Sequence, residues 1–179
     1  MSKIKIVKTK FKNLYLLKPK GYVDRRGSFS RLYCSYELEK IIKKKIKQIN
    51  LSFFKKSGVM RGLHYQTGNK KECKIIYCVK GEVYDIALDL RLKSKTYRKY
   101  FKTKLSEKKH MLVLIPEGFA HGVISLKKNS QIIYFSTNYY SKKSERIINV
   151  NDPGLNIKLP TKIKIISKKD QNSKFLFNK

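Results

Sequence analysis

The sequence has little of several residue types, and each shortage excludes a class of protein. Its 179 residues include no Trp, only 4 Pro and only 9 Gly, which excludes collagen-like and low-complexity chains. The 3 Cys (Cys34, Cys73 and Cys78) are an odd number without framework spacing, which fits a reducing compartment rather than a disulfide scaffold. The longest apolar run, residues 111–116, is far too short to span a bilayer, and residues 1–12 lack a signal-peptide core. We therefore expect a cytoplasmic protein with no membrane partner.

Acidic residues are also scarce, with 12 Asp and Glu against 43 Lys and Arg, which gives a net charge of +31. Such an excess first suggests nucleic-acid binding. The basic residues are mostly lysines spread over the whole chain, whereas phosphate and base readers favour the bidentate fork of arginine. We interpret the excess as compositional bias that permits only nonspecific binding of nucleic acid. The content of 41% hydrophobic and 12% aromatic residues excludes a disordered basic tail.

The pattern of hydrophobic residues predicts one all-β domain over residues 1–179. In residues 82–90, Tyr84, Ile86 and Leu88 fall on one face by period two, and Asp85 and Asp89 fall on the other. Further strands are expected at residues 3–11, 73–79, 111–115, 121–126 and 130–136. A last strand and a polar tail are expected after the turn signal at residues 152–154. Short strands at this spacing, without helices between them, predict a sandwich or barrel.

One helix is expected over residues 35–47. Leu38, Ile41, Ile42 and Ile46 recur at helical spacing with lysines between them, and Ser35 can cap the start. The acidic residues stand near the start and the lysines near the end, which suits the helix dipole. The lysine run is therefore interpreted as a solvated helix face rather than a nucleic-acid patch.

Of the 3 histidines, two lie in distinctive segments. His64 follows Gly62 in GVMRGLHYQ, and strand parity places Met60, Gly62 and His64 on one face, with open space beside the imidazole. His64 is then either a catalytic base or a hydrogen-bonded core residue. His121 follows a glycine-containing turn in IPEGFAHGV, where ligand groups often lie. The histidines are far apart and form no H-x-H pair, so no metal site is expected.

Several longer segments occur in one order: QINLSFFKKSGVMRGLHYQ, GEVYDIALDLRLKSKTY, LIPEGFAHGV, IIYFSTNYYS and NDPGLNIKLP. In this respect residues 3–170 resemble the dTDP-4-dehydrorhamnose 3,5-epimerase family. The resemblance implies a cupin jelly roll with one or two short peripheral helices. It also implies a homodimer with an exchanged N-terminal strand, and no metal or other cofactor.

The implied substrate is a nucleoside-diphospho-4-keto-6-deoxy sugar, whose ketone acidifies the hydrogens at C3 and C5. Inversion then needs a base, a stabiliser of the enolate oxygen and an acid on the other side of the ring. The resemblance assigns the base to His64 with Asp170 as its partner, the cation to Lys74 and the acid to Tyr134. From the residues alone, a solvated Asp170, a snorkelling Lys74 and a core Tyr134 remain open.

The resemblance also assigns binding residues, and one position departs from the family. The binding residues are Arg26, Arg61 and Lys169 for the phosphates, His121 for the sugar, Gln48 and Asn50 for the nucleoside, Tyr22 and Tyr140 for the base, and Glu145. In the segment DRRGSFSR, Arg31 replaces a family Glu that contacts the nucleotide. A carboxylate accepts from N3–H of thymine, whereas a guanidinium only donates.

The expected substrate is the dTDP-linked sugar. The alternatives are a mono-epimerase acting at C3 or C5 on a CDP- or GDP-linked sugar, and, in another class, a non-catalytic basic protein that binds nucleic acid or sugar nucleotides.

Overall fold

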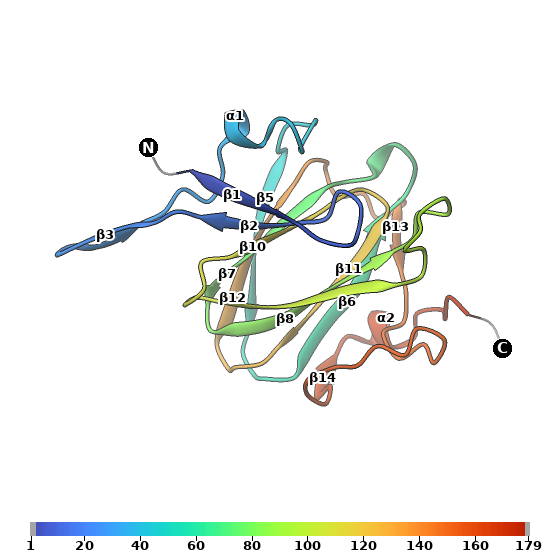
Figure 1. Ribbon diagram of the computed structural model, residues 1–179. Coiled ribbons are helices and arrows are strands. Elements are labelled where there is room, and N and C mark those ends of the chain that lie inside the picture. The colour runs from blue at the N-terminus through green and yellow to red at the C-terminus, as the bar shows by residue number, and fades with distance from the viewer. Residues whose placement is uncertain (1–2, 178–179) are drawn as a thin grey trace.

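The computed structural model describes residues 3–177 and shows two facing, mainly antiparallel sheets (Figure 1). The first sheet has, in order, β1 (Ile4–Lys8), β2 (Tyr15–Pro19), β10 (Leu112–Ile115), β7 (Lys74–Lys80), β12 (Ser130–Ser136) and β5 (Gln48–Phe54). The second has β13 (Glu145–Ile147), β6 (Val59–Gln66), β11 (Phe119–Ser125), β8 (Glu82–Asp89) and β9 (Tyr100–Ser106), with β14 (Ile165–Ile166) paired to β6. The predicted all-β jelly roll is confirmed.

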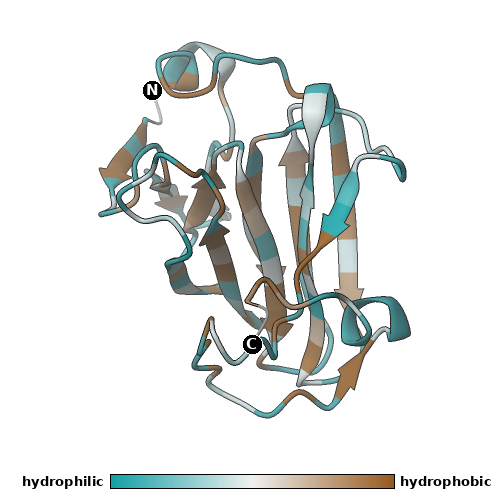
Figure 2. Ribbon diagram, turned by 90° about the vertical axis from the view of Figure 1, so that its right-hand side faces the viewer, coloured by the Kyte–Doolittle hydropathy of each residue, from teal (hydrophilic) through white to brown (hydrophobic). Residues whose placement is uncertain are grey.

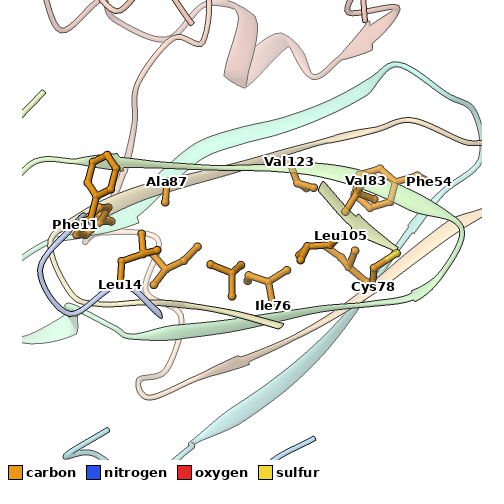
Figure 3. Packing of buried hydrophobic residues seen from close by; sticks show 13 residues of the cluster. Phe11, Leu14, Phe54, Ile76, Cys78, Val83, Ala87, Leu105 and Val123 are labelled. Atoms are coloured by element: carbon orange, nitrogen blue, oxygen red, sulfur yellow. The ribbon is translucent and has the colours of Figure 1, made fainter. Parts of the chain in front are cut away.

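Side chains from both sheets form the core between them (Figure 3). On β8, Val83 and Ala87 face this layer and pack near Ile76 of β7 and Val123 of β11. Ile86 and Leu88 of the same strand point to the other face, where they belong to a separate apolar cluster. The period-two alternation predicted for residues 82–90 is therefore confirmed, and it turns Asp85 and Asp89 toward the inside.

The C-terminal part of the chain covers the outer face of the second sheet. Ile148, Val150 and Leu155 pack there against Ile86 and Leu88, and the outer cluster is buried as thoroughly as the inner one. Figure 2 shows hydrophobic residues along the strands and hydrophilic residues over most loops. The single final strand expected after residue 154 is only the two-residue β14. It is followed by the helix α2 (Lys168–Gln171), which the sequence did not indicate.

The helix predicted over residues 35–47 is wrong in length. The helix α1 spans only Ser35–Leu38, its N-cap residue is Cys34 with no side-chain cap, and two further backbone bonds to the Leu38 carbonyl end it. Leu38 and Ile42 are buried against the outer face of the first sheet. Lysines four residues apart, Lys40 with Lys44 and Lys43 with Lys47, would repel each other on a longer helix, and packing of the apolar residues on the sheet decides the conformation instead. A further helical element is a 3-10 helix, Gly68–Lys70.

One element extends away from the two sheets. The strands β3 (Tyr22–Asp24) and β4 (Gly27–Phe29) form a hairpin arm that projects from the end of β2 (Figure 1). Its apolar side chains are exposed, with Val23 82% and Phe29 65% accessible. Within residues 3–177, no helix is long and apolar enough to cross a membrane.

Candidate active site

An open cavity of about 710 Å³ lies between the two sheets. The second sheet contributes Arg61 and His64 from β6 and His121 from β11 to its wall, and the first sheet contributes Lys74 from β7 and Tyr134 from β12. These five side chains are scattered over the sequence. The strand order brings them together, because β7 and β12 are neighbours in one sheet and β6 and β11 are neighbours in the other.

An irregularity in β6 turns two of these side chains inward. His121 pairs with His64 and Val123 pairs with Arg61, so the register shifts between the two pairs and a β-bulge places Arg61 and His64 on one side. Met60 instead packs in the outer cluster. The prediction that Met60, Gly62 and His64 share a face is therefore wrong. Open space beside Gly62 is wrong too, because a Cβ there would clash with the backbone oxygen of His121.

His64 forms a close pair with Asp170 of α2. Its Nε2 lies 2.6 Å from Asp170 Oδ1, while the Gly62 N–H donates to Oδ2 at 3.1 Å. The Asp170 N–H donates to Ser167 Oγ, which caps the helix and fixes the carboxylate. Burial alone would raise the pKa of Asp170, but the bonds from His64, Gly62 and Ser167 hold it below its ordinary value. With Asp170 ionised, Nε2–H donates to it and Nδ1 remains the basic nitrogen of the ring.

His121 has a carboxylate partner of its own. Its Nε2 lies 2.7 Å from Asp85 Oδ2, and the Asp85 side chain is fully buried. Because His121 and His64 pair in register, the two imidazoles stand on neighbouring strands of one wall. Oδ1 of Asp85 is buried without a hydrogen-bond partner among the described residues. Asp85 was not singled out as a site residue. The period-two pattern of residues 82–90 contained the signal, because it placed a carboxylate on the inner face.

Lys74 is an inward-pointing lysine at the start of β7. Its side chain is 14% exposed, and Nζ lies 3.3 Å from Oε1 of Glu72. The sequence indicated that Lys74 shares a face with Ile76 and Cys78 and needs an anionic partner there. Both apolar residues lie in the inner core, and Glu72 is that partner. Glu72 was missed, although its position two residues before Lys74 in an extended segment was a usable signal.

Tyr134 stands on the sheet opposite His64. It pairs with Asn50 of β5 and Ile76 of β7, and it packs against the inner core. Burial, followed by the charge of Glu72, raises the pKa of Tyr134, and Arg61 opposes this shift. The phenol is therefore held in its protonated form, as a proton donor requires.

A smaller cavity of about 270 Å³ shares His64, Lys74 and Tyr134 with the first. Its other walls are polar. The Tyr140 N–H donates to Gln48 Oε1 at 2.9 Å, Gln48 Nε2 donates to Asn50 Oδ1 at 3.2 Å, and the Tyr140 hydroxyl donates to Glu145 at 3.0 Å. Lys169 forms an ion pair with the same Glu145 oxygen. Nδ2 of Asn50 is buried without a partner among residues 3–177, so it is available to a ligand.

The structure does not bring the remaining candidate residues to these cavities within one chain. Tyr22 lies on the projecting arm and is 48% exposed. Arg26 lies at the tip of the arm, paired with Asp24, and its side chain is 85% exposed. Arg31 follows the arm and forms an ion pair with Glu37 at 3.0 Å.

The cavities combine bases, acids and cations in the way that proton transfer on an anionic substrate requires. His64 offers a basic nitrogen, Tyr134 a proton on the facing sheet, and Lys74 a cation on the same wall as Tyr134. Arg61 and Lys169 add positive charge for phosphate oxygens. In the described part of the chain, no three His, Cys, Asp or Glu side chains are grouped to hold a metal ion.

Comparison with known proteins identifies the family. The family model for dTDP-4-dehydrorhamnose 3,5-epimerase matches residues 8–178. The chain belongs to the dTDP-4-dehydrorhamnose 3,5-epimerase family. The Salmonella typhimurium dTDP-4-dehydrorhamnose 3,5-epimerase is 36% identical to it over 87% of this chain and 85% of the relative. Like other members of the family, the protein is a nucleotide-sugar epimerase.

Solved structures of family members have the same fold. The Bacillus anthracis dTDP-4-dehydrorhamnose 3,5-epimerase, with TDP and PPi bound, has a TM-score of 0.93 and 33% identity, over 97% of this chain and 99% of that one. The Legionella pneumophila dTDP-6-deoxy-D-glucose-3,5-epimerase, in complex with dTDP-4-keto-L-rhamnose, has a TM-score of 0.91 and 34% identity, over 96% and 92%. The jelly roll is thus the cupin-type fold of this epimerase family.

Proposed function

We propose that the protein converts dTDP-4-dehydro-6-deoxyglucose to dTDP-4-dehydrorhamnose by inverting C3 and C5. The observation that carries the proposal is the His64–Asp170 pair facing Tyr134 across one cavity, with Lys74 beside it. A base and an acid on opposite walls are what removal of a proton from one face and return to the other face demand. The ligands named for the Bacillus and Legionella structures support a dTDP-linked substrate.

In this mechanism His64 takes the proton from the carbon next to the ketone. Nδ1 accepts it, and Asp170, held ionised by its hydrogen bonds, stabilises the imidazolium that results. The electrons of the broken C–H bond move onto the ketone oxygen, and the Lys74 ammonium stabilises this enolate. Tyr134 then gives its proton to the opposite face of the carbon. His64 and Tyr134 return to their first state by exchanging protons with water, and the same cycle at the second carbon completes the reaction.

The nucleotide binds, in this proposal, at the polar end of the site. The larger cavity is lined by Arg61 and Lys169, which offer donors to the phosphate oxygens. The smaller cavity is lined by Asn50, whose unpaired Nδ2 offers a donor to an oxygen of the base. His121 lines the sugar part. Arg31 forms an ion pair with Glu37 in the single chain. We infer that Arg31 sets the preference of the enzyme for the base of the nucleotide.

We infer that a second copy of the chain completes the site. A folded monomer of 21.1 kDa exposes roughly 9,000 Å², whereas this chain exposes 11140 Å². Much apolar surface lies on the projecting arm and on the edge strand β5, where Ile49, Leu51 and Phe53 are exposed in a row. In a homodimer the arm of one chain would bring Tyr22 and Arg26 to the cavity of the other. Exchange of the N-terminal strand stays a prediction; in the single chain β1 pairs with β2.

The test is direct product formation. The protein is incubated with dTDP-4-keto-6-deoxyglucose, and the inverted sugar is followed by proton NMR alongside a His64→Ala variant. We expect product from the wild type and a loss of turnover of at least about a hundredfold in the variant, the scale of general base catalysis. An unchanged rate in His64→Ala, or no product from the wild type at any enzyme concentration, contradicts the proposal.

A further inference from the structure

One ionised group at the site has no part in the mechanism above. Glu72 precedes β7, its side chain is only 11% exposed, and Oε1 lies 3.3 Å from the Lys74 ammonium. The hydroxyl of Ser136 on β12 donates to Oε2, so both carboxylate oxygens have partners from the walls of the site. Glu72 lines the polar cavity together with Lys74 and Tyr134. A carboxylate removed from water in this way is retained only where it is paired and hydrogen-bonded.

The segment that carries Glu72 is fixed by its neighbours. The Cys73 N–H donates to Thr137 Oγ1 at 2.9 Å, and the Thr137 N–H donates to the Cys73 carbonyl at 3.1 Å. Asn138 Nδ2 donates to the Lys71 carbonyl at 3.3 Å. Glu72 therefore stands between two anchored residues, so the Glu72–Lys74 pair has a defined geometry rather than that of a surface ion pair.

The same carboxylate acts on Tyr134. After burial, the charge of Glu72 is the next cause that raises the pKa of the Tyr134 phenol, and Arg61 opposes it. Other groups that line the cavities with Tyr134 also bear charge or can titrate: His64, Tyr65, Lys74, His121, Tyr140, Glu145, Lys169 and Asp170. Glu72 itself forms an ion pair with Lys74 of β7 and accepts from Ser136 of β12, the strand that carries Tyr134.

We propose that Glu72 is a positioning residue: it holds the Lys74 ammonium where the enolate oxygen develops. This role rests on the proposed function. It assigns Glu72 no contact with the substrate. It explains why an anion is buried in a site that binds a doubly anionic substrate, where an unpaired carboxylate would oppose binding.

The test is Glu72→Gln, which keeps the shape and the acceptor for Ser136 but removes the charge. We expect kcat to fall about tenfold, the scale of losing one charge-assisted partner, with little change in KM. The alkaline limb of kcat/KM, measured from pH 7 to 11, should move to lower pH, because the phenol loses its proton more easily without the neighbouring anion. Glu82→Gln is the matched control. Its partner Lys104 is also at 3.3 Å, but the pair lies outside both cavities.

Two further variants separate positioning from stability. In a Lys74→Ala background, Glu72→Gln should lower kcat by less than threefold, because the residue through which Glu72 acts is gone. Glu72→Asp keeps the charge and should keep the wild-type alkaline limb. If circular dichroism shows that Glu72→Gln is unfolded, Glu72→Asp takes its place in the test. A lowered kcat of Glu72→Asp with an unchanged alkaline limb then supports the positioning role.

The outcomes are distinct. Wild-type kcat and an unmoved alkaline limb in the folded Glu72 variants overturn the positioning role while the wild-type enzyme still epimerises. A full tenfold loss that persists in the Lys74→Ala background overturns it as well. Absence of turnover in the wild type instead overturns the proposed function, and the role of Glu72 with it.

Discussion

The substitution Asp170→Asn removes one charge from the centre of the site and changes almost nothing else in size. Both oxygens of Asp170 accept hydrogen bonds. Oδ1 accepts from His64 Nε2–H at 2.6 Å, and Oδ2 accepts from the Gly62 N–H at 3.1 Å. An asparagine offers one oxygen, so its NH₂ must face a donor on one of the two sides. The variant therefore loses the charge that stabilises the imidazolium and leaves one hydrogen bond unmade.

The magnitude follows from the geometry. His64 is 32% exposed, so an intermediate effective dielectric constant is appropriate for the pair. Two unit charges about 4 Å apart at a dielectric constant of about 20 attract by about 4 kcal/mol, which corresponds to about a thousandfold in rate. Because the imidazolium exists only after proton removal, this loss should appear in kcat and leave KM nearly unchanged.

The assay is the initial rate of epimerisation by NMR, with thermal unfolding measured in parallel. Asp152→Asn is the matched control: Asp152 is 1% exposed and accepts from the Gly154 and Phe177 N–H groups, away from the cavities. The control should lose stability and keep kcat. A folded Asp170→Asn enzyme within threefold of wild-type kcat would refute the role of the dyad.

Three more predictions concern the acid, the pH dependence of stability and the assembly. Tyr134→Phe should still exchange a substrate hydrogen with deuterated water but yield no inverted product; loss of exchange as well would rule out the acid role. At Asp89, burial alone would raise the pKa, but bonds from Arg91 and two hydroxyl groups lower it to about 2. Because the pKa of Asp89 is lower in the folded state than in the unfolded state, its ionised form stabilises the protein above about pH 4. This contribution to the free energy of unfolding, about 2 kcal/mol, is lost as the pH falls toward 2. The stability gap between wild type and Asp89→Asn, measured by urea unfolding, should narrow by that amount from pH 6 to pH 2, and a constant gap would contradict the assignment. Ile49→Asp, on the exposed edge strand, should give monomers in sedimentation velocity with kcat/KM reduced about tenfold, the scale of losing charged phosphate contacts. The exposed Leu92→Asp control should not do so, and a persistent Ile49→Asp dimer would exclude β5 from the interface.

The sequence was sufficient for strands such as β8, where period-two alternation reports burial directly, but it did not indicate β2, β5 or β9. Residues 82–90 show this best, since Ile86 and Leu88 face the outer cluster and Asp85 is buried on the inner side beside His121, as the alternation required. The same logic failed at β6. A bulge adds one residue to the strand and reverses its parity. The isolated Gly62 inside GVMRGLHYQ was the usable local signal, because a glycine within a strand often marks a bulge. The assignment of His64 as the base comes from the resemblance, not from its predicted face, and stays a prediction.

Several residues of the candidate site could not be placed from the sequence, because their positions depend on contacts between distant segments. Asp170 stands in a polar tail and reads as a solvated charge, yet the C-terminal segment folds back and buries it against β6. Long-range packing of this kind leaves no local pattern. Helix spacing in residues 35–47 was misleading for the same reason, because Leu38 and Ile42 are buried by the first sheet and not by a helix partner. Tyr22 and Arg26 lie on the projecting arm, away from the cavities of their own chain, so their binding roles stay predictions.

Incorporation of deuterium from solvent shows whether His64 transfers a proton at C3 and C5. The wild-type protein is mixed with dTDP-4-keto-6-deoxyglucose in deuterium oxide, and the label at each sugar carbon is read by NMR. We expect deuterium at both C3 and C5 of the inverted product, with His64→Ala incorporating none above the uncatalysed rate. Product formed without deuterium at either carbon, or labelling that is unchanged in His64→Ala, would contradict proton transfer by His64 in this cavity.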